Sequence, residues 1–84
     1  MEIEYINKII NQWDPIGLFE AHVPQNEYMF EVKMIKEYCE TNNIDSCKLG
    51  EKIYDIFIDS FGENEFNKNV NDCILIAHNI LNKK

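Results

Sequence analysis

Residues 13–28, WDPIGLFEAHVPQNEY, decide how this chain is organised. They hold the only tryptophan, both prolines and one of the three glycines. Because Asp14 precedes Pro15, the α conformation is disfavoured at Asp14, and a preceding helix should end near Trp13. The second proline, Pro24, stands where another helix can begin. We therefore expect a loop between two helices, with Pro15 and the positive φ that Gly17 permits forming its first turn.

Apolar residues recur at helical spacing on both sides of this loop, which is the pattern of amphipathic helices. The first segment shows the pattern most simply, because its isoleucines and Trp13 fall on one face. Applied to the whole chain, the pattern predicts four helices, at about 2–13, 25–41, 46–61 and 64–82. The fold class predicted is all-α, a compact bundle of about four helices in a single domain over residues 1–84.

Capping residues stand at the ends of the last two predicted helices. Asp45 or Ser46 can cap the third helix, Gly62 suits its C-terminal end, and Asn64 can cap the fourth. Gly50 lies inside the apolar arc of the third helix, where glycine costs about 1 kcal/mol relative to alanine. We therefore expect another helix to approach closely at Gly50.

The Trp13–Tyr28 stretch also carries a family resemblance. WDPIGL at residues 13–18, followed by Pro24 and then Glu27-Tyr28, resembles the signature of a small bacterial family, domain of unknown function 1871. The resemblance extends over nearly the whole chain, although Gln25 and Asn26 stand where members of that family often carry acidic residues. It implies a compact helical bundle. The activity of the family is not established, so the resemblance supplies no catalytic residues.

The charge of the chain limits its partners. Fifteen carboxylates against eight lysines, with no arginine, give a net charge of −7. Binding to nucleic acid or to an anionic membrane surface needs clustered basic residues, so neither is expected. No apolar run approaches the ~18 residues of a membrane-spanning helix, and the N-terminus is unlike a signal peptide. We expect a cytoplasmic protein whose acidic surface suits a basic protein partner.

No catalytic or cofactor-binding motif is present in the sequence. It contains no phosphate-binding glycine loop, no HExxH and no GxSxG. Cys39, Cys47 and Cys73 are an odd number without a CxxC pair, which favours free buried thiols. Their spacing to His22 and His78 matches no zinc-ligand pattern. We therefore expect no enzyme activity, no cofactor and no metal.

The leading functional hypothesis is a non-catalytic protein-interaction module, either an immunity-like protein that neutralises a toxin or a small regulatory adaptor. Aromatic residues are frequent binding hot spots, and the Trp13–Tyr28 loop is rich in them. The alternatives are a homo-oligomeric structural module and a helical protein that binds a small ligand or metal beneath this loop, and the chain is a monomer or a homodimer. The same loop could equally close one end of the core. The candidate interaction surface comprises Trp13, Asp14, Pro15, Gly17, Phe19, Tyr28 and Phe30.

Overall fold

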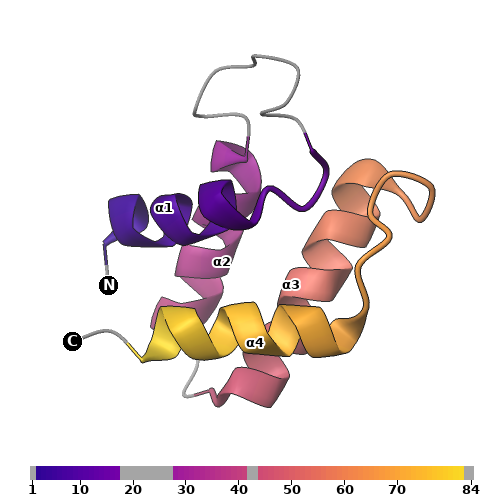
Figure 1. Cartoon of the computed structure of the whole chain (residues 1–84). Helices are drawn as coiled ribbons and strands as arrows, with labels where there is room; N and C mark the ends of the chain where they lie inside the picture. The colour runs from indigo at the N-terminus through magenta and orange to yellow at the C-terminus, as the bar shows by residue number, and fades with distance from the viewer. Residues whose placement is uncertain (1, 18–27, 42–43, 83–84) are drawn as a thin grey trace.

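Four α-helices form the architecture, which confirms the predicted all-α bundle. The computed structural model describes residues 2–17, 28–41 and 44–82, and within these residues there is no strand. The helices are α1 (Ile3–Trp13), α2 (Met29–Thr41), α3 (Ser46–Phe61) and α4 (Val70–Leu81), in the arrangement of Figure 1.

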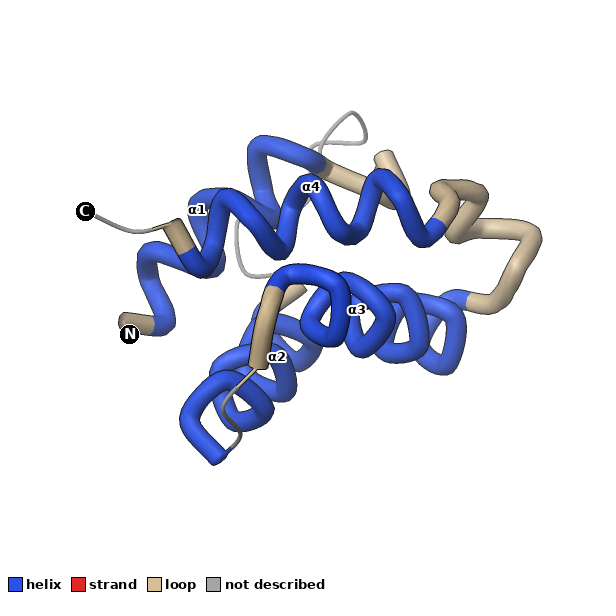
Figure 2. The backbone as a smooth tube through the Cα atoms, turned by 90° about the horizontal axis from the view of Figure 1, so that it is seen from below, coloured by secondary structure: helices blue, strands red, loops and turns tan. Residues whose placement is uncertain are grey.

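The helices are arranged in two layers. Helices α1 and α4 run antiparallel in one layer, and α2 and α3 lie in the other and cross beneath them (Figures 1 and 2). The most extensive packing is between α3 and α4, and α1 contacts both α2 and α4. The hydroxyl of Tyr5 donates a hydrogen bond of 3.0 Å to the backbone carbonyl of Asn79, which ties the first helix to the last.

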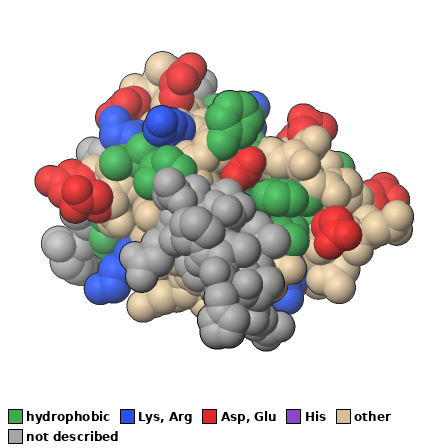
Figure 3. All heavy atoms as spheres, turned by 90° about the horizontal axis from the view of Figure 1, so that it is seen from above, with side chains coloured by type: hydrophobic (Ala, Val, Ile, Leu, Met, Phe, Trp, Pro, Cys, Tyr) green, Lys and Arg blue, Asp and Glu red, His purple; other side chains and the backbone are tan. Residues whose placement is uncertain are grey.

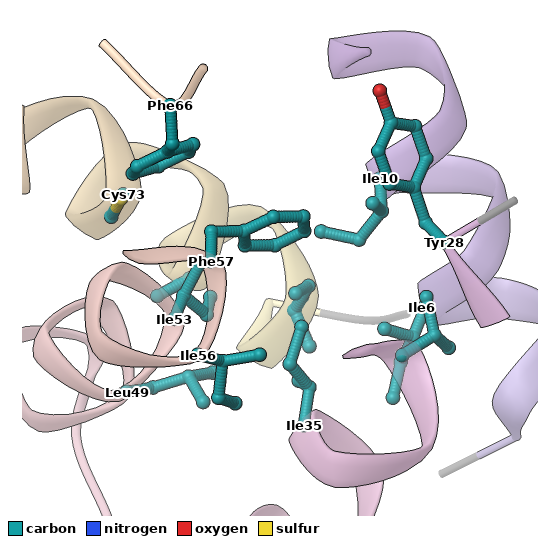
Figure 4. Close-up of a cluster of buried hydrophobic side chains, with 13 residues drawn as sticks. Ile6, Ile10, Tyr28, Ile35, Leu49, Ile53, Ile56, Phe57, Phe66 and Cys73 are labelled. Atoms are coloured by element: carbon teal, nitrogen blue, oxygen red, sulfur yellow. The ribbon is translucent and has the colours of Figure 1, made fainter. Parts of the chain in front are cut away.

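Phe57 of α3 lies at the centre of the core (Figure 4). Its ring stacks on Phe66 at a centroid distance of 5.3 Å and meets the rings of Trp13 and Tyr28 edge-on, each at 5.9 Å. These aromatic residues come from α1, the start of α2, α3 and the α3–α4 connection. The Phe57 ring therefore contacts α1, the start of α2 and the α3–α4 connection. Such aromatic pairs contribute roughly 0.5–1.5 kcal/mol each beyond their burial.

The predicted ends of α1 and α3 agree with the structure. Helix α1 stops at Trp13, and Asp14 takes a left-handed conformation with φ 47° while its N–H donates to the carbonyl of Ile10 at 2.8 Å. Helix α3 is capped by Asp45, whose carboxylate accepts the Lys48 N–H at 2.9 Å. It ends at Gly62 with φ 82°.

The predicted starts of the other two helices need correction. Residues 25–27 lie outside the described residues, and Tyr28 is in a turn, so α2 begins at Met29. Helix α4 begins at Val70 rather than near residue 64. Its cap is reciprocal: the Asp72 N–H donates to Asn69 Oδ1 at 2.8 Å, and the Asn69 N–H reaches Asp72 Oδ2 at 3.5 Å. This capping box supplies the N-terminal partners that the prediction assigned to Asn64.

The close approach expected at Gly50 is confirmed. A Cβ atom at this position would lie 2.5 Å from Cγ1 and 2.6 Å from Cα of Ile74. Helix α4 therefore passes over α3 at a distance that only glycine permits. Cys73 and Ala77 of the same helix are buried in the core.

Candidate functional site

Hydrogen bonds link the turn after α1 to Tyr28, the residue that precedes α2. The Tyr28 hydroxyl donates to Asp14 Oδ1 at 2.6 Å and accepts the N–H of Ile16 at 3.2 Å. A further backbone bond of 3.0 Å runs from the Gly17 N–H to the Asp14 carbonyl, and Gly17 has φ 78°. We call this arrangement the Asp14–Tyr28 clasp. It holds the turn after α1 against the residue that precedes α2.

The clasp changes the interpretation of two predicted surface residues. Tyr28 is 0% exposed and Pro15 is also buried, so neither offers a contact to a partner. The prediction that Tyr28 is an exposed aromatic is therefore wrong. The physical reason is that its ring packs edge-on against Phe57 and Phe61. Its hydroxyl donates one hydrogen bond and accepts another within the clasp.

The other predicted surface residues do not form one patch. Trp13 is half-buried, with its ring set edge-on against Phe57 and Phe66. Phe30, the second residue of α2, is 69% exposed. Phe19 lies outside the described residues. The structure thus buries Tyr28, leaves Trp13 and Asp14 partly buried, and leaves Phe30 as an exposed aromatic.

A group of carboxylates that sequence reasoning missed lies at the end of the molecule formed by α3 and the α3–α4 connection. Asp55, Asp59, Glu63 and Glu65 are all exposed, and the chain carries no basic residue between Lys52 and Lys68. Figure 3 shows acidic side chains on this end, at its right. We call these four residues the acidic end. The run of four carboxylates without a lysine was visible in the sequence as a local charge pattern.

The acidic end is electrostatically unfavourable for the helix that carries it. A helix C-terminus bears a partial negative charge, which cations stabilise and carboxylates oppose. Helix α3 has no basic residue in its last turn, and Asp59 lies there. Asp55 and Asp59 are also four residues apart, a spacing at which like charges repel on a helix. This end of the molecule therefore favours a positively charged neighbour.

The cysteines lie in three different environments. Cys73 is buried in the core, and burial, together with the nearby carboxylate of Asp72, raises the pKa of its thiol to about 12. Burial also raises the pKa of the half-buried Cys39, with a further contribution from Glu40. Cys47 is exposed, which corrects the expectation that all three are buried. The raised pKa values keep Cys39 and Cys73 protonated at neutral pH, and a protonated thiol is a poor nucleophile.

The described residues contain neither a metal-binding group nor a membrane-spanning helix. Over 2–17, 28–41 and 44–82, no three His, Cys, Asp or Glu side chains are grouped in a way that could hold a metal ion. His78 is exposed on α4. Among the helices described, none combines the length and the apolar character needed to cross a bilayer.

Comparisons with protein-family models, with curated proteins and with solved structures find no match to this chain.

Proposed function

We propose that this chain is a non-catalytic, cytoplasmic protein-interaction module that binds a basic protein partner through its acidic end. The observation that carries the proposal is the group Asp55, Asp59, Glu63 and Glu65, exposed together at the negative end of α3 with no lysine between them. An immunity-like or regulatory protein would use such a surface to cover a basic region of its target. Electrostatic complementarity of this kind speeds association and selects the partner.

We also propose that the chain belongs to the family that its signature resembles, domain of unknown function 1871. The Asp14–Tyr28 clasp supports this, because it gives a physical reason for WDPIG and the later tyrosine to occur together. On this proposal the signature marks a shared way of joining α1 to α2. Recognition of a partner then depends on residues outside the signature.

The test compares the native chain with a variant carrying both Asp59→Lys and Glu63→Lys. Each is used as a tagged bait in extracts of the cells that naturally produce the chain, at low and at high salt. We expect a basic protein to be retained by the native chain at low salt, released as salt screens the charges, and not retained by the variant. A matched control carries Glu37→Lys and Glu51→Lys, a reversal of two exposed carboxylates outside the acidic end.

Three results would contradict the proposal. The first is that no basic protein is retained at any salt concentration. The second is that the double variant retains the same protein as the native chain. The third is that the control with Glu37→Lys and Glu51→Lys loses the partner as completely as the Asp59→Lys, Glu63→Lys variant, since net charge alone would then explain the binding.

A second candidate function, self-association, is favoured by one observation. Phe30 is 69% exposed, and Met34 and Tyr38 follow it at four-residue intervals along α2. Met34 and Tyr38 are partly buried and pack against the core. Phe30, Met34 and Tyr38 therefore form a row along α2 whose exposed edge is apolar. A homodimer would bury this edge.

Sedimentation at micromolar concentration separates this candidate from a monomer. Self-association through Phe30 predicts a dimer for the native chain and a monomer for Phe30→Lys. A native chain that stays monomeric at every concentration, or a Phe30→Lys variant that remains dimeric, rules out self-association through this residue.

A further inference from the structure

A groove lies between α1 and α4, on the opposite layer of the fold from the row at Phe30. Its volume is about 460 Å³. One wall comes from α1 (Tyr5, Ile9, Gln12 and Trp13), and the other comes from α4 (Ile76, Asn79 and Asn82). We call it the α1–α4 groove. A volume of a few hundred Å³ is within the range of ligand sites in proteins.

The groove is lined without charge. None of its lining residues is Asp, Glu, Lys or His, although the chain as a whole has a net charge of −7. The polar groups that line it include three carboxamides, of Gln12, Asn79 and Asn82, all exposed at the rim. Each carboxamide offers two N–H donors and one carbonyl acceptor. This lining suits a ligand that is neutral where it touches the groove and that forms hydrogen bonds with carboxamides.

Two aromatic side chains stand at the ends of the α1 wall and are held in place by the fold. Tyr5 is fixed by its hydrogen bond to the Asn79 carbonyl, and Trp13 by its edge contacts with Phe57 and Phe66. Trp13 lies eight residues after Tyr5 on the helix, a rise of about 12 Å. Four residues of polyproline II helix also span about 12 Å, at ~3.1 Å per residue. Fixed rings lower the entropy lost on binding.

We propose that the α1–α4 groove binds a neutral, proline-rich peptide segment in the polyproline II conformation. Aromatic-lined grooves suit such segments, because proline rings pack against flat side chains and the backbone carbonyls remain free to accept hydrogen bonds. The carboxamide N–H groups of Gln12, Asn79 and Asn82 would supply the donors. The groove offers only Ile9 and Ile76 as aliphatic contacts, which is too little for the apolar face of a helix, and the described residues contain no sheet edge to pair with a strand.

This inference is independent of the proposal for the acidic end, since the two surfaces share no residue. They also differ in their response to salt. Binding at the acidic end depends on charge and weakens as salt increases, whereas a neutral peptide in the groove should bind equally at low and high salt.

The native sequence contains a built-in probe, because Trp13 is its only tryptophan and lines the groove. Titration with an uncharged oligoproline peptide should change the Trp13 emission saturably, and a glycine-serine peptide of equal length should not. Gln12→Ala and Asn82→Ala should each weaken the binding by about three- to tenfold, the usual effect of one lost hydrogen bond. Asn71→Ala, an exposed carboxamide on α4 outside the groove, should leave it unchanged.

Nuclear magnetic resonance shifts on the same titration locate the peptide, and those of Ile9 and Ile76 should move. The proposal is overturned by any of four outcomes: no saturable change with oligoproline, an equal change with glycine-serine, an equal loss in Asn71→Ala, or shifts confined to residues outside the groove. Saturable binding of adenosine without binding of oligoproline would also overturn it and would make the groove a small-ligand site.

Discussion

Tyr28 illustrates how much one residue does in a small fold. Its hydroxyl donates to a carboxylate and accepts a backbone N–H, while its ring fills the core beside Phe57. A hydrogen bond to a charged group contributes more than one between neutral groups. At the scale of the residue, Tyr28 and Asp14 hold the turn after α1 against the start of α2.

Replacing Tyr28 with phenylalanine should lower the free energy of unfolding by roughly 1.5–3 kcal/mol, because the Asp14 carboxylate loses a donor and the Ile16 N–H loses its acceptor. Urea unfolding measures the change. Tyr54→Phe is the control, since the Tyr54 hydroxyl has no hydrogen bond among the described residues. Equal losses in the two variants would mean that the clasp adds nothing. A double-mutant cycle with Asp14→Ala isolates the coupling between the two side chains.

Gly50→Ala should destabilise the chain although alanine is the better helix former. The added methyl group would overlap the backbone and side chain of Ile74, so α3 and α4 would have to separate. We expect a loss of roughly 1–3 kcal/mol, as for other overpacked cores. Ser60→Ala, at an exposed position on the same helix, should change stability by less than about 0.5 kcal/mol. A Gly50→Ala variant as stable as Ser60→Ala would show that α3 and α4 can accommodate the added methyl group, which contradicts the prediction.

Cys73 should make the stability depend on pH in the alkaline range. Its pKa is raised to about 12 in the folded chain, from about 9 when the thiol is exposed. The folded state therefore keeps a proton that the unfolded state loses, and this contribution to stability is complete below about pH 9 and is lost as the pH rises toward 12. The urea midpoint of the native chain should fall over this window relative to that of Cys73→Ala. Parallel profiles for the two proteins would contradict the burial of this thiol.

At the scale of the element, α3 carries both the centre of the core and the acidic end. Its last turn has no cation to offset the negative end of the helix. Asp59→Lys should therefore stabilise the chain, by roughly 0.3–1 kcal/mol at low ionic strength. Thermal unfolding at low and high salt measures the gain, which should shrink as salt screens it. A destabilised variant would mean that Asp59 makes a contact important to the fold.

The start of α4 shows where sequence reasoning stops. Phe66 continues the helical spacing of Val70, Cys73 and Ala77, and Asn64 is a capping residue type, so an earlier start was a reasonable prediction. In the structure Phe66 instead lies in the connection, stacked on Phe57, and the reciprocal cap at Asn69 and Asp72 begins the helix five residues later. A tertiary contact overrides the local pattern, and nothing in the local sequence reveals it.

At the scale of the whole molecule, the fold class and the ends of α1 and α3 could be predicted from the sequence because apolar spacing and capping residues act locally. The candidate site could be predicted only in part. The aromatic content of the signature stretch predicted a binding surface, yet burial depends on which rings meet, and Tyr28 proved to be a core residue. The acidic end was readable as a charge run at the predicted end of the third helix, and the structure adds that its four carboxylates are exposed.

The central claim is a separation of roles: the Asp14–Tyr28 clasp serves the fold, and the acidic end serves recognition. The most direct test measures the free energy of unfolding and partner retention in the same two variants, Tyr28→Phe and the double variant Asp59→Lys with Glu63→Lys. We predict that Tyr28→Phe loses stability and keeps the partner at temperatures where it remains folded, while the charge variant keeps or gains stability and loses the partner. The reverse pattern, a stable Tyr28→Phe that loses the partner beside a charge variant that retains it, would contradict the account.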